Sequence, residues 1–316
     1  MELKERSEIF LRHRGALMGL AYRMLGSLSE AEDAVQDTYL RWREAEPTAL
    51  SDAKAWLMKV CSRRCIDQLR KAYRQRESYV GTWLPDPLPN AFRPWVEPVC
   101  SPAALAETSE NLSIAFLLLL EKLSPMERAV FLLHDVFQYS FGEVAAFVDG
   151  TEGQCRKAGQ RARAAIQRDR PRFDAPGADA YQVMERFFSA ARNGEEATLQ
   201  ELLATGSEFW SDGGGKVAAA NRVLDDTRQI AHFFAGLGRL ALRQGMELRW
   251  DFTLVNNRPG LLLAKRGDDG QFHLETVFSF EFQDRKISRI FAMRNPEKLS
   301  HLTEASPDLH FPSQEG

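Results

Sequence analysis

Two clusters of basic side chains are the residues whose type and spacing suit a chemical task, the binding of a polyanion. Eight lysines and arginines lie between Lys54 and Arg76, with one acidic residue, Asp67, among them. A second cluster, residues 152–172, holds seven basic and two acidic residues. Because the 316-residue chain has a net charge of −3, both clusters stand out against an acidic remainder. We therefore expect two separate contacts with nucleic acid.

The first cluster is predicted to form one helix with a polar face. Phosphates attract its cations, whereas the mixture of serine, arginine, aspartate and glutamine on this face can also bond to base edges. Trp56 and Ile66 are among the apolar residues expected to pack inward. The alternative is a solvated basic face on an ordinary helix. The predicted DNA-contacting residues are Lys59, Ser62, Arg63, Asp67, Arg70 and Arg74.

The second cluster follows the pattern of a helix-turn-helix. Residues 141–148 form a short apolar-periodic stretch, "DGT" supplies a turn, and Thr151 is placed to cap a basic helix. The alternative is an amphipathic helix of a bundle. In a helix-turn-helix the early residues of the second helix enter the major groove. We assign Arg156, Lys157 and Gln160 to base edges, and Arg161 and Arg163 to phosphates.

Helical patterns also fill the rest of residues 1–79. "SLSEAEDAVQDTYLRWREAE" suggests a capping box between Ser29 and Glu32. The following apolar stripe contains Ala31, Ala34, Val35, Thr38, Tyr39 and Trp42. The opposite face carries Asp33, Gln36, Asp37 and Leu40. This acidic and polar face suits a basic protein partner rather than DNA.

The middle and the end of the chain have different compositions. Residues 80–111 are rich in proline and form a linker, either a stiff spacer or a segment that docks through its tryptophans. Helical patterns return at 103–170. After 178 the pattern is helices followed by β-rich segments at 246–255, 260–267, 272–282 and 286–294. This order predicts an α+β domain with an antiparallel sheet, followed by a flexible tail at 300–316.

Metal, cofactor and catalytic chemistry have weak support in this sequence. The four cysteines, at 61, 65, 100 and 155, form no C-x-x-C pair, and we predict buried thiols, no metal and no cofactor. Polar residues of the C-terminal domain that an enzyme pocket could use are His232, Asp251, His273 and Glu275. Strand alternation is the better explanation of such polar positions, so we predict that the protein is not an enzyme. The first residues show no signal peptide, and we expect a cytoplasmic protein without membrane contact.

Several of these motifs resemble a known family. "AEDAVQDTYLRWRE" with "AWLMKVCSRRCIDQLR" resembles the second domain of extracytoplasmic-function (ECF) sigma factors. "LEKLSPMERAVFLLHDVFQYSFGEVAAFV" with "CRKAGQRARAAI" is similar to their fourth domain, which reads the −35 element. "WLPDPLP" (83–89), "DGGGK" (212–216) and "NPEKL" (295–299) resemble the subgroup with a fused SnoaL-like domain. Glu297 stands where that subgroup usually has aspartate.

The resemblance implies a multidomain fold of two all-α sigma domains and a C-terminal α+β SnoaL-like cone. The expected boundaries are sigma domain 2 at 1–79, the linker at 80–111, sigma domain 4 with the helix-turn-helix at 112–172, the SnoaL-like domain at 178–299 and the tail at 300–316. The face with Asp33, Gln36, Asp37 and Leu40 would dock on the β′ clamp helices of core RNA polymerase, which the protein also meets through the β subunit. Loop 47–53 would hold a flipped −10 base, beside the first basic helix.

The resemblance also implies that the C-terminal domain regulates the protein through contacts with the linker or the sigma domains. The expected contact residues are Trp83, Asp212, Gly213, Gly214, Gly215, Lys216, Asn295, Pro296, Glu297, Lys298 and Leu299. The predicted function is an alternative sigma factor that directs promoter-specific initiation. A helix-turn-helix regulator with a small-molecule-sensing domain is the main alternative, and a SnoaL-like isomerase or hydrolase is a further one.

Overall fold

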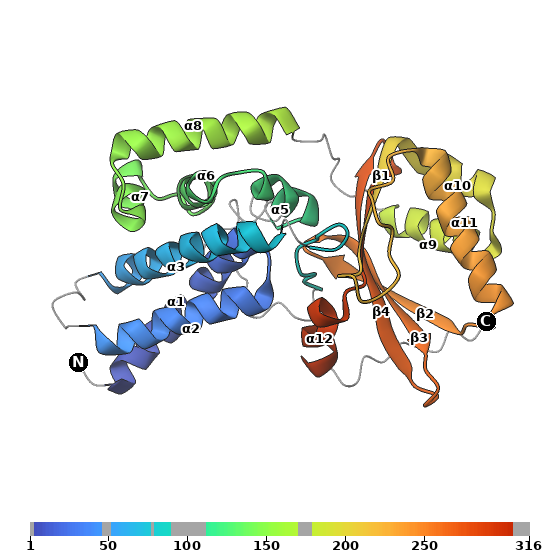
Figure 1. Ribbon diagram of the computed structural model, residues 1–316, viewed down its shortest axis with the longest axis horizontal. Helices are drawn as coiled ribbons and strands as arrows, with labels where there is room; N and C mark the ends of the chain where they lie inside the picture. The colour runs from blue at the N-terminus through green and yellow to red at the C-terminus, as the bar shows by residue number, and fades with distance from the viewer. Residues whose placement is uncertain (1–2, 46–51, 77–78, 90–111, 170–178, 306–316) are drawn as a thin grey trace. The chain divides into compact units, whose positions relative to one another are not determined.

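The computed structural model describes residues 3–45, 52–76, 79–89, 112–169 and 179–305, which divide into two compact units (Figure 1). The helical unit contains residues 1–78 and 93–170. The mixed unit contains residues 79–92 and 171–316. The start of the predicted linker therefore belongs to the C-terminal unit.

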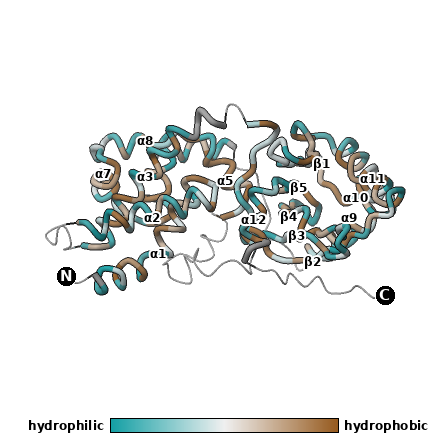
Figure 2. Tube along the Cα trace, turned by 60° about the horizontal axis from the view of Figure 1, so that its bottom comes forward, coloured by the Kyte–Doolittle hydropathy of each residue, from teal (hydrophilic) through white to brown (hydrophobic). Residues whose placement is uncertain are grey.

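The helical unit has two groups of helices. The first group is α1 (Leu3–Leu25), α2 (Leu28–Glu44) and α3 (Ala53–Arg76). The second group is α5 (Ile114–Glu121), α6 (Pro125–Phe131), the π-helical turn η3 (Leu132–Val136), α7 (Phe141–Val148) and α8 (Glu152–Asp169). Hydrophilic and hydrophobic residues recur along these helices in Figure 2, as expected for amphipathic helices that bury one face.

Helix α2 confirms the predicted stripe but not the predicted cap. Its buried side chains include Ala31, Ala34, Val35, Thr38 and Trp42. The helix begins at Leu28, with Ser27 at the N-cap and no side-chain capping bond. The expected Ser29–Glu32 capping box is therefore wrong, because Ser29 lies inside the first turn, where its hydroxyl is 3.1 Å from that of Ser27.

The helix-turn-helix is confirmed together with the predicted Thr151 cap, and the structure adds a cap at the start of its first helix. Ser140 and Glu143 form a reciprocal capping box at the start of α7. The turn contains Asp149 in the left-handed conformation, with φ of 54°. Thr151 accepts a hydrogen bond from the Gln154 amide at 3.3 Å, and its own amide donates to the Gln154 side chain at 2.9 Å. These local bonds fix where α7 ends and where the basic helix α8 begins.

The mixed unit contains a five-stranded sheet with helices. Its elements are α9 (Ala180–Asn193), α10 (Glu196–Leu202), β1 (Leu203–Asp212), α11 (Thr227–Arg243), β2 (Leu248–Val255), β3 (Arg258–Arg266), β4 (Phe272–Gln283), β5 (Lys286–Met293) and α12 (Pro296–Ala305). The strand order is β1-β5-β4-β3-β2. The sequence predicted four of these strands and missed β1, which pairs parallel with β5, so the sheet is mixed rather than antiparallel.

An aromatic core joins this sheet to the helices. Phe187 and Phe188 of α9 and Phe234 of α11 pack with Phe278 and Phe280 of β4 in one buried cluster. Ring centroids in this cluster lie 5.0–6.4 Å apart, the spacing typical of stabilising aromatic pairs. Packed aromatic rings thus lie between the helices and the sheet, the region where a SnoaL-like cone could hold a ligand.

The end of the described chain is helical. Residues 296–305 form α12, so the predicted flexible tail at 300–316 is wrong for its first six residues. Proline at the first helical position favours this helix start, because its missing N–H is not needed there. Residues 306–316 lie outside the described part. Among the described residues, every helix is too short or too polar to cross a membrane.

Candidate nucleic-acid interface and linker clamp

Helix α3 presents part of the predicted DNA face to solvent. Asp67 and Arg70 are exposed and form an ion pair of 3.4 Å within the helix. Lys59 is half-buried. Ser62 is only 1% exposed and donates to the Met58 carbonyl at 2.6 Å. The prediction that Ser62 contacts a base is therefore wrong. The Arg74 side chain and loop 47–51 lie outside the described residues.

Arg63 of this face contacts another element of the helical unit. Its guanidinium donates to the Phe147 carbonyl at 3.1 Å and forms an ion pair with Asp149. Both partners belong to the helix-turn-helix. The two predicted DNA-binding segments are therefore in direct contact within the helical unit.

Helix α8 presents the predicted recognition residues to solvent. Arg156, Lys157 and Gln160 are all exposed, although Arg156 also forms an ion pair with Glu152 one turn earlier. The two residues predicted to bind phosphates form ion pairs with neighbouring elements. Arg161 lies 2.7 Å from Glu127 of α6, and Arg163 lies 2.7 Å from Asp135 of η3. Arg161 is 68% exposed, so its ion pair is weak and leaves it available to a phosphate, whereas Arg163 is held by two bonds to Asp135.

The predicted polymerase-binding face of α2 is exposed at three of its four residues. Asp33, Gln36 and Leu40 are open to solvent. Asp37 instead forms an ion pair of 2.7 Å with Arg64 of α3, which ties the two helices together. A pocket of about 380 Å³ lies beside Gln36.

A buried carboxylate organises the second site, which we call the linker clamp: Asp212 and the groups that it binds. Asp212 is fully buried at the end of β1. It accepts hydrogen bonds from the Tyr79 hydroxyl at 2.7 Å, the Leu84 amide at 2.9 Å, the Gly214 amide at 2.9 Å and the Lys298 ammonium at 2.9 Å. One charge thus connects residues 79–84 to the glycine loop and to α12.

Lys298 closes the clamp on the proline-rich segment. Its ammonium lies 4.4 Å from the centre of the Trp83 ring and 5.3 Å from that of Tyr79, within cation–π distance. It also donates to the Leu84 carbonyl. Asn295 donates to the Tyr79 hydroxyl at 3.0 Å. The segment therefore docks on the C-terminal domain, and the alternative of a free spacer is excluded for residues 79–89.

The three glycines of the loop are required by close approach. A Cβ at Gly214 would lie 2.3 Å from the Asn295 amide nitrogen, and one at Gly213 would lie 2.4 Å from the Val217 carbonyl. Gly214 and Gly215 also have φ of 61° and 71°, where side chains are strained. Lys216, the last residue of the loop, forms an ion pair with Glu297. Glutamate at this position therefore supplies the same negative charge as the aspartate that is usual in the subgroup.

Three residues that hold the proline-rich segment were absent from the sequence prediction. Tyr79 precedes the predicted linker motif, and burial followed by its bond to Asp212 raises the pKa of its hydroxyl. Asn256 exchanges two hydrogen bonds with the Leu88 backbone, at 2.8 and 2.9 Å. His301 lies 3.2 Å from the Pro87 carbonyl. The Asn-Asn turn between two β-rich segments was a usable signal for Asn256, since both residues have positive φ.

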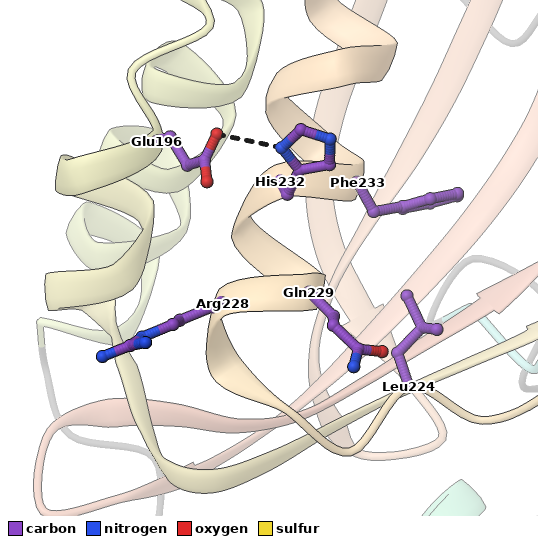
Figure 3. Close-up of a pocket in the computed structure, with 6 residues that line it drawn as sticks. All are labelled: Glu196, Leu224, Arg228, Gln229, His232 and Phe233. Atoms are coloured by element: carbon purple, nitrogen blue, oxygen red, sulfur yellow. Dashed lines mark hydrogen bonds and ion pairs between the residues drawn. The ribbon is translucent and has the colours of Figure 1, made fainter.

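The four residues considered for catalysis lie apart. His232 is at the rim of an open pocket of about 440 Å³ and pairs with Glu196, while Arg228 and Phe233 of the same pocket point in opposite directions (Figure 3). None of the other three candidates lines this pocket. His273 pairs with Asp269, Glu275 pairs with Arg294, and Asp251 is exposed on β2.

The described cysteines behave as core residues. Cys61, Cys65 and Cys155 are free and buried, whereas Cys100 lies outside the described part. A hydrogen bond with Cys61, and then burial, raise the pKa of Cys65, which opposes the thiolate that metals and oxidants need. Within the described ranges, no group of three or more histidine, cysteine or acidic residues could hold a metal.

An exposed acidic-faced helix, a basic helix and a helix-turn-helix in one unit are the arrangement expected of a transcription-initiation factor of the sigma-70 type. Two family models agree with this assignment: Sigma-70 region 2 matches residues 9–75, and Sigma-70 region 4 matches residues 113–166. The region 2 match includes the first basic helix. The alternative, a helix-turn-helix regulator with a sensor domain, gives this helix no role.

Comparison with known proteins narrows the class. The chain is 31% identical over 290 residues to the ECF RNA polymerase sigma factor SigJ of Mycobacterium tuberculosis, covering 91% of each chain. It is 32% identical over 218 residues to the probable ECF sigma factor SigI of that organism, covering 67% of this chain and 72% of the relative. The crystal structure of SigJ matches with a TM-score of 0.67 and 28% identity, covering 95% and 98% of the two chains.

The chain belongs to the ECF RNA polymerase sigma factors. The match over nearly its whole length confirms the predicted architecture of helical sigma domains followed by a SnoaL-like α+β domain. Proteins of this family bind RNA polymerase and promoter DNA, and they regulate transcription rather than catalyse a reaction.

Proposed function

We propose that this sigma factor is controlled by its own C-terminal domain, which acts by holding the proline-rich segment in the linker clamp. The observation that carries the proposal is the four-donor coordination of Asp212, because two of those donors come from Tyr79 and Leu84. The segment lies between regions 2 and 4. When residues 79–89 are docked, a shorter part of the linker connects the two regions. Docking therefore limits how far regions 2 and 4 can separate.

In the initiation complex, we assign polymerase binding to the exposed face of α2. Asp33, Gln36 and Leu40 would contact the β′ clamp helices, and region 4 would meet the β subunit. An acidic and polar rim around an exposed leucine complements a basic partner. Promoter contacts fall to α3 at the −10 element and to α8 at the −35 element. The protein would act where RNA polymerase does, in the cytoplasm.

We assign the contact between the C-terminal domain and sigma domain 2 to residues 295–299 and the segment that follows them. Pro296 and Glu297 are exposed at the start of α12, so they can meet a partner surface while Lys298 and Leu299 face inward. Truncation after Leu299 removes most of α12 and should alter promoter output.

Run-off transcription with core polymerase tests the proposal. The template would be a library of genomic fragments, and the proteins would be the full chain, a chain ending after Arg172 and a chain ending after Leu299. The full chain is expected to start RNA synthesis, and the truncated chains are expected to differ from it in output. Absence of transcripts with every protein would refute promoter recognition, and equal output from all three would refute control by the C-terminal domain.

A clamp variant separates regulation from loss of the domain. Lys298→Met removes the ammonium that bridges Asp212, Trp83 and Leu84. Arg285→Gln removes an exposed ion pair with Asp179 in the same domain and serves as the matched control. We expect Lys298→Met to shift output in the direction of the Arg172 truncation, and Arg285→Gln to leave it at the level of the full chain.

A further inference from the structure

Arg63 of the predicted −10 helix is surrounded by oxygen atoms of the helix-turn-helix. Its Nε donates to the Phe147 carbonyl at 3.1 Å, one Nη approaches the Ala146 carbonyl at 3.5 Å, and the same Nη forms the ion pair with Asp149. Three oxygens on one guanidinium resemble the oxygens of a phosphate group, which is the ligand expected for this side chain on DNA.

The position of these oxygens explains their attraction for a cation. Helix α7 ends at Val148, and the Gly150 amide takes up the Ala145 carbonyl. The next two carbonyls, of Ala146 and Phe147, lie at the negative end of the helix dipole and accept from Arg63 instead. Asp149 adds a full negative charge immediately after that end. The left-handed backbone at Asp149 turns the chain there, at φ of 54°. A helix C-terminus and a carboxylate therefore act together on one arginine.

A second cation of α3 makes a similar contact. The Lys54 ammonium lies 5.6 Å from the centre of the Tyr139 ring, just before α7. This distance is within the range of a cation–π interaction. Lys54 and Arg63 are both on the promoter-binding helix, and both are bound by the region that leads into or out of α7.

This closed arrangement cannot contact both promoter elements at once. The −10 and −35 elements are about 25 base pairs apart, which is about 85 Å along B-DNA. Helix α3 and the end of α7 are within hydrogen-bond distance of each other. The two regions must therefore separate before α3 and α8 can each reach their own element.

The contacts between regions 2 and 4 differ in accessibility. Arg128 of α6 is 2% exposed, and it donates to the Met24 carbonyl of α1 at 2.6 Å. The side chains of Arg63 and Asp149 are 36% and 68% exposed. A polyanion can therefore reach the Arg63 contact in the closed unit, whereas the Arg128 contact is shielded.

We propose that Asp149 and the last carbonyls of α7 form an autoinhibitory latch on Arg63, and that DNA phosphates compete with this latch. In the closed sigma factor a −10-binding cation is then occupied by protein oxygens until a polyanion displaces them. This inference rests on the proposed function, because it takes α3 to be a DNA-binding helix. It adds a control point inside the sigma regions, separate from the linker clamp.

Substitutions at Asp149 test the latch without disturbing the turn. Asn and Gly both accept the left-handed conformation, so Asp149→Asn and Asp149→Gly remove the charge and keep the backbone. Glu8→Gln makes the same change in net charge at an exposed position of α1, outside the predicted DNA-binding residues, and serves as the control for general electrostatic effects. Thermal unfolding of each full-length variant confirms that it is folded.

The probe is a fluorescein-labelled single strand of twelve thymidines, bound to the full chain at low salt and followed by anisotropy. A phosphate latch is insensitive to base sequence, so this probe reports it directly. Both Asp149 variants should bind about two- to five-fold tighter than the natural chain, the range that one exposed ion pair contributes. In a chain that already carries Arg63→Gln, adding Asp149→Asn should give no gain in affinity.

The outcomes separate the latch from the proposed function. Equal binding by the natural chain and the Asp149 variants, or the same gain with Glu8→Gln, would overturn the latch. A gain that survives Arg63→Gln would overturn it as well. Run-off transcription by the natural chain reports on promoter recognition independently. Transcription without an Asp149 effect would reject only the latch, and an Arg63-dependent gain without transcription would reject only the proposed function.

Discussion

The Lys298 ammonium lies 2.9 Å from the Asp212 carboxylate, although 86 residues separate them in the sequence. Asp212 ends a strand, and Lys298 is in the first turn of the last described helix. The carboxylate is fully buried and the lysine side chain is 12% exposed. A pair this shielded from water depends on both partners, because either charge left alone would be costly to bury.

Replacement of Lys298 by methionine should therefore open the linker clamp. Methionine keeps the length of the side chain but leaves Asp212 buried without its countercharge, at a cost of about 3 kcal/mol. The Leu84 amide is the best reporter, because it donates to Asp212. Its hydrogen exchange should become about 100-fold faster.

Lys216→Met is the control for this experiment. Lys216 forms its ion pair with Glu297 at the surface, where the two side chains are 46% and 69% exposed. Such pairs contribute less than about 1 kcal/mol. The Leu84 amide should exchange within about five-fold of the natural rate, and similar rates in the two variants would contradict the role given to Lys298.

The glycine loop gives a second test, in which steric and conformational effects can be separated. Gly214→Ala places a Cβ 2.3 Å from the Asn295 side chain and also strains a backbone with φ of 61°. Gly206→Ala has the same strain, with φ of 72°, but its Cβ meets no atom within 4 Å. We expect about 1 kcal/mol of destabilisation at Gly206 and at least twice that at Gly214.

Urea unfolding of the two full-length alanine variants, followed by circular dichroism, measures this difference. The signal to compare is the transition of the mixed unit. If Gly214→Ala is no less stable than Gly206→Ala, then Asn295 moves freely and does not fix the loop against the linker segment.

Tyr79 should make the clamp sensitive to alkaline pH. Burial, followed by the hydrogen bond to Asp212, raises the pKa of its hydroxyl. A raised pKa means that the folded state favours the neutral phenol, so its contribution is complete below the unfolded value of about 10 and is lost as pH rises above it. Docking of residues 79–89 should weaken from about pH 10 upward.

Tyr79→Phe is the matched variant for this titration. Phenylalanine keeps the ring near Lys298 and removes the ionisable hydroxyl. The difference in Leu84 amide protection between the natural chain and Tyr79→Phe should be constant from pH 7 to 9 and should shrink above pH 10. A difference that stays constant beyond pH 10 would show that Tyr79 ionises alike in the docked and free states.

The sequence predicted local features better than long-range ones. The limits of α7, the turn and the start of α8 follow from caps and glycine within a few residues, and the structure confirms them. The strand β1 was missed because its pairing partner, β5, is about eighty residues away and its alternation is broken at Gly206. A parallel edge strand is not joined to its partner by a hairpin, so the sequence carries no turn signal that predicts the pairing.

The same distinction applies to the candidate sites. The exposed residues of α2 and α8 follow from helical periodicity, because a face opposite an apolar stripe must meet solvent. Ser62 departed from the prediction because it found a partner that periodicity does not specify, the Met58 carbonyl. Tyr79 joined the clamp through contacts with residues more than 130 positions away.

Recognition of the −35 element should divide the basic residues of α8 into two groups. Gln160 is exposed on the face assigned to base edges, so Gln160→Ala should weaken binding about 5- to 100-fold at one base pair and relax the preference there. Arg161 is 68% exposed and is assigned to a phosphate. Arg161→Ala should weaken all sequences alike and lower the salt dependence by about one counterion. Anisotropy of the polymerase holoenzyme on duplex −35 fragments, at several salt concentrations, distinguishes the two effects. A loss of base preference in Arg161→Ala, or a uniform loss in Gln160→Ala, would reverse the two assignments.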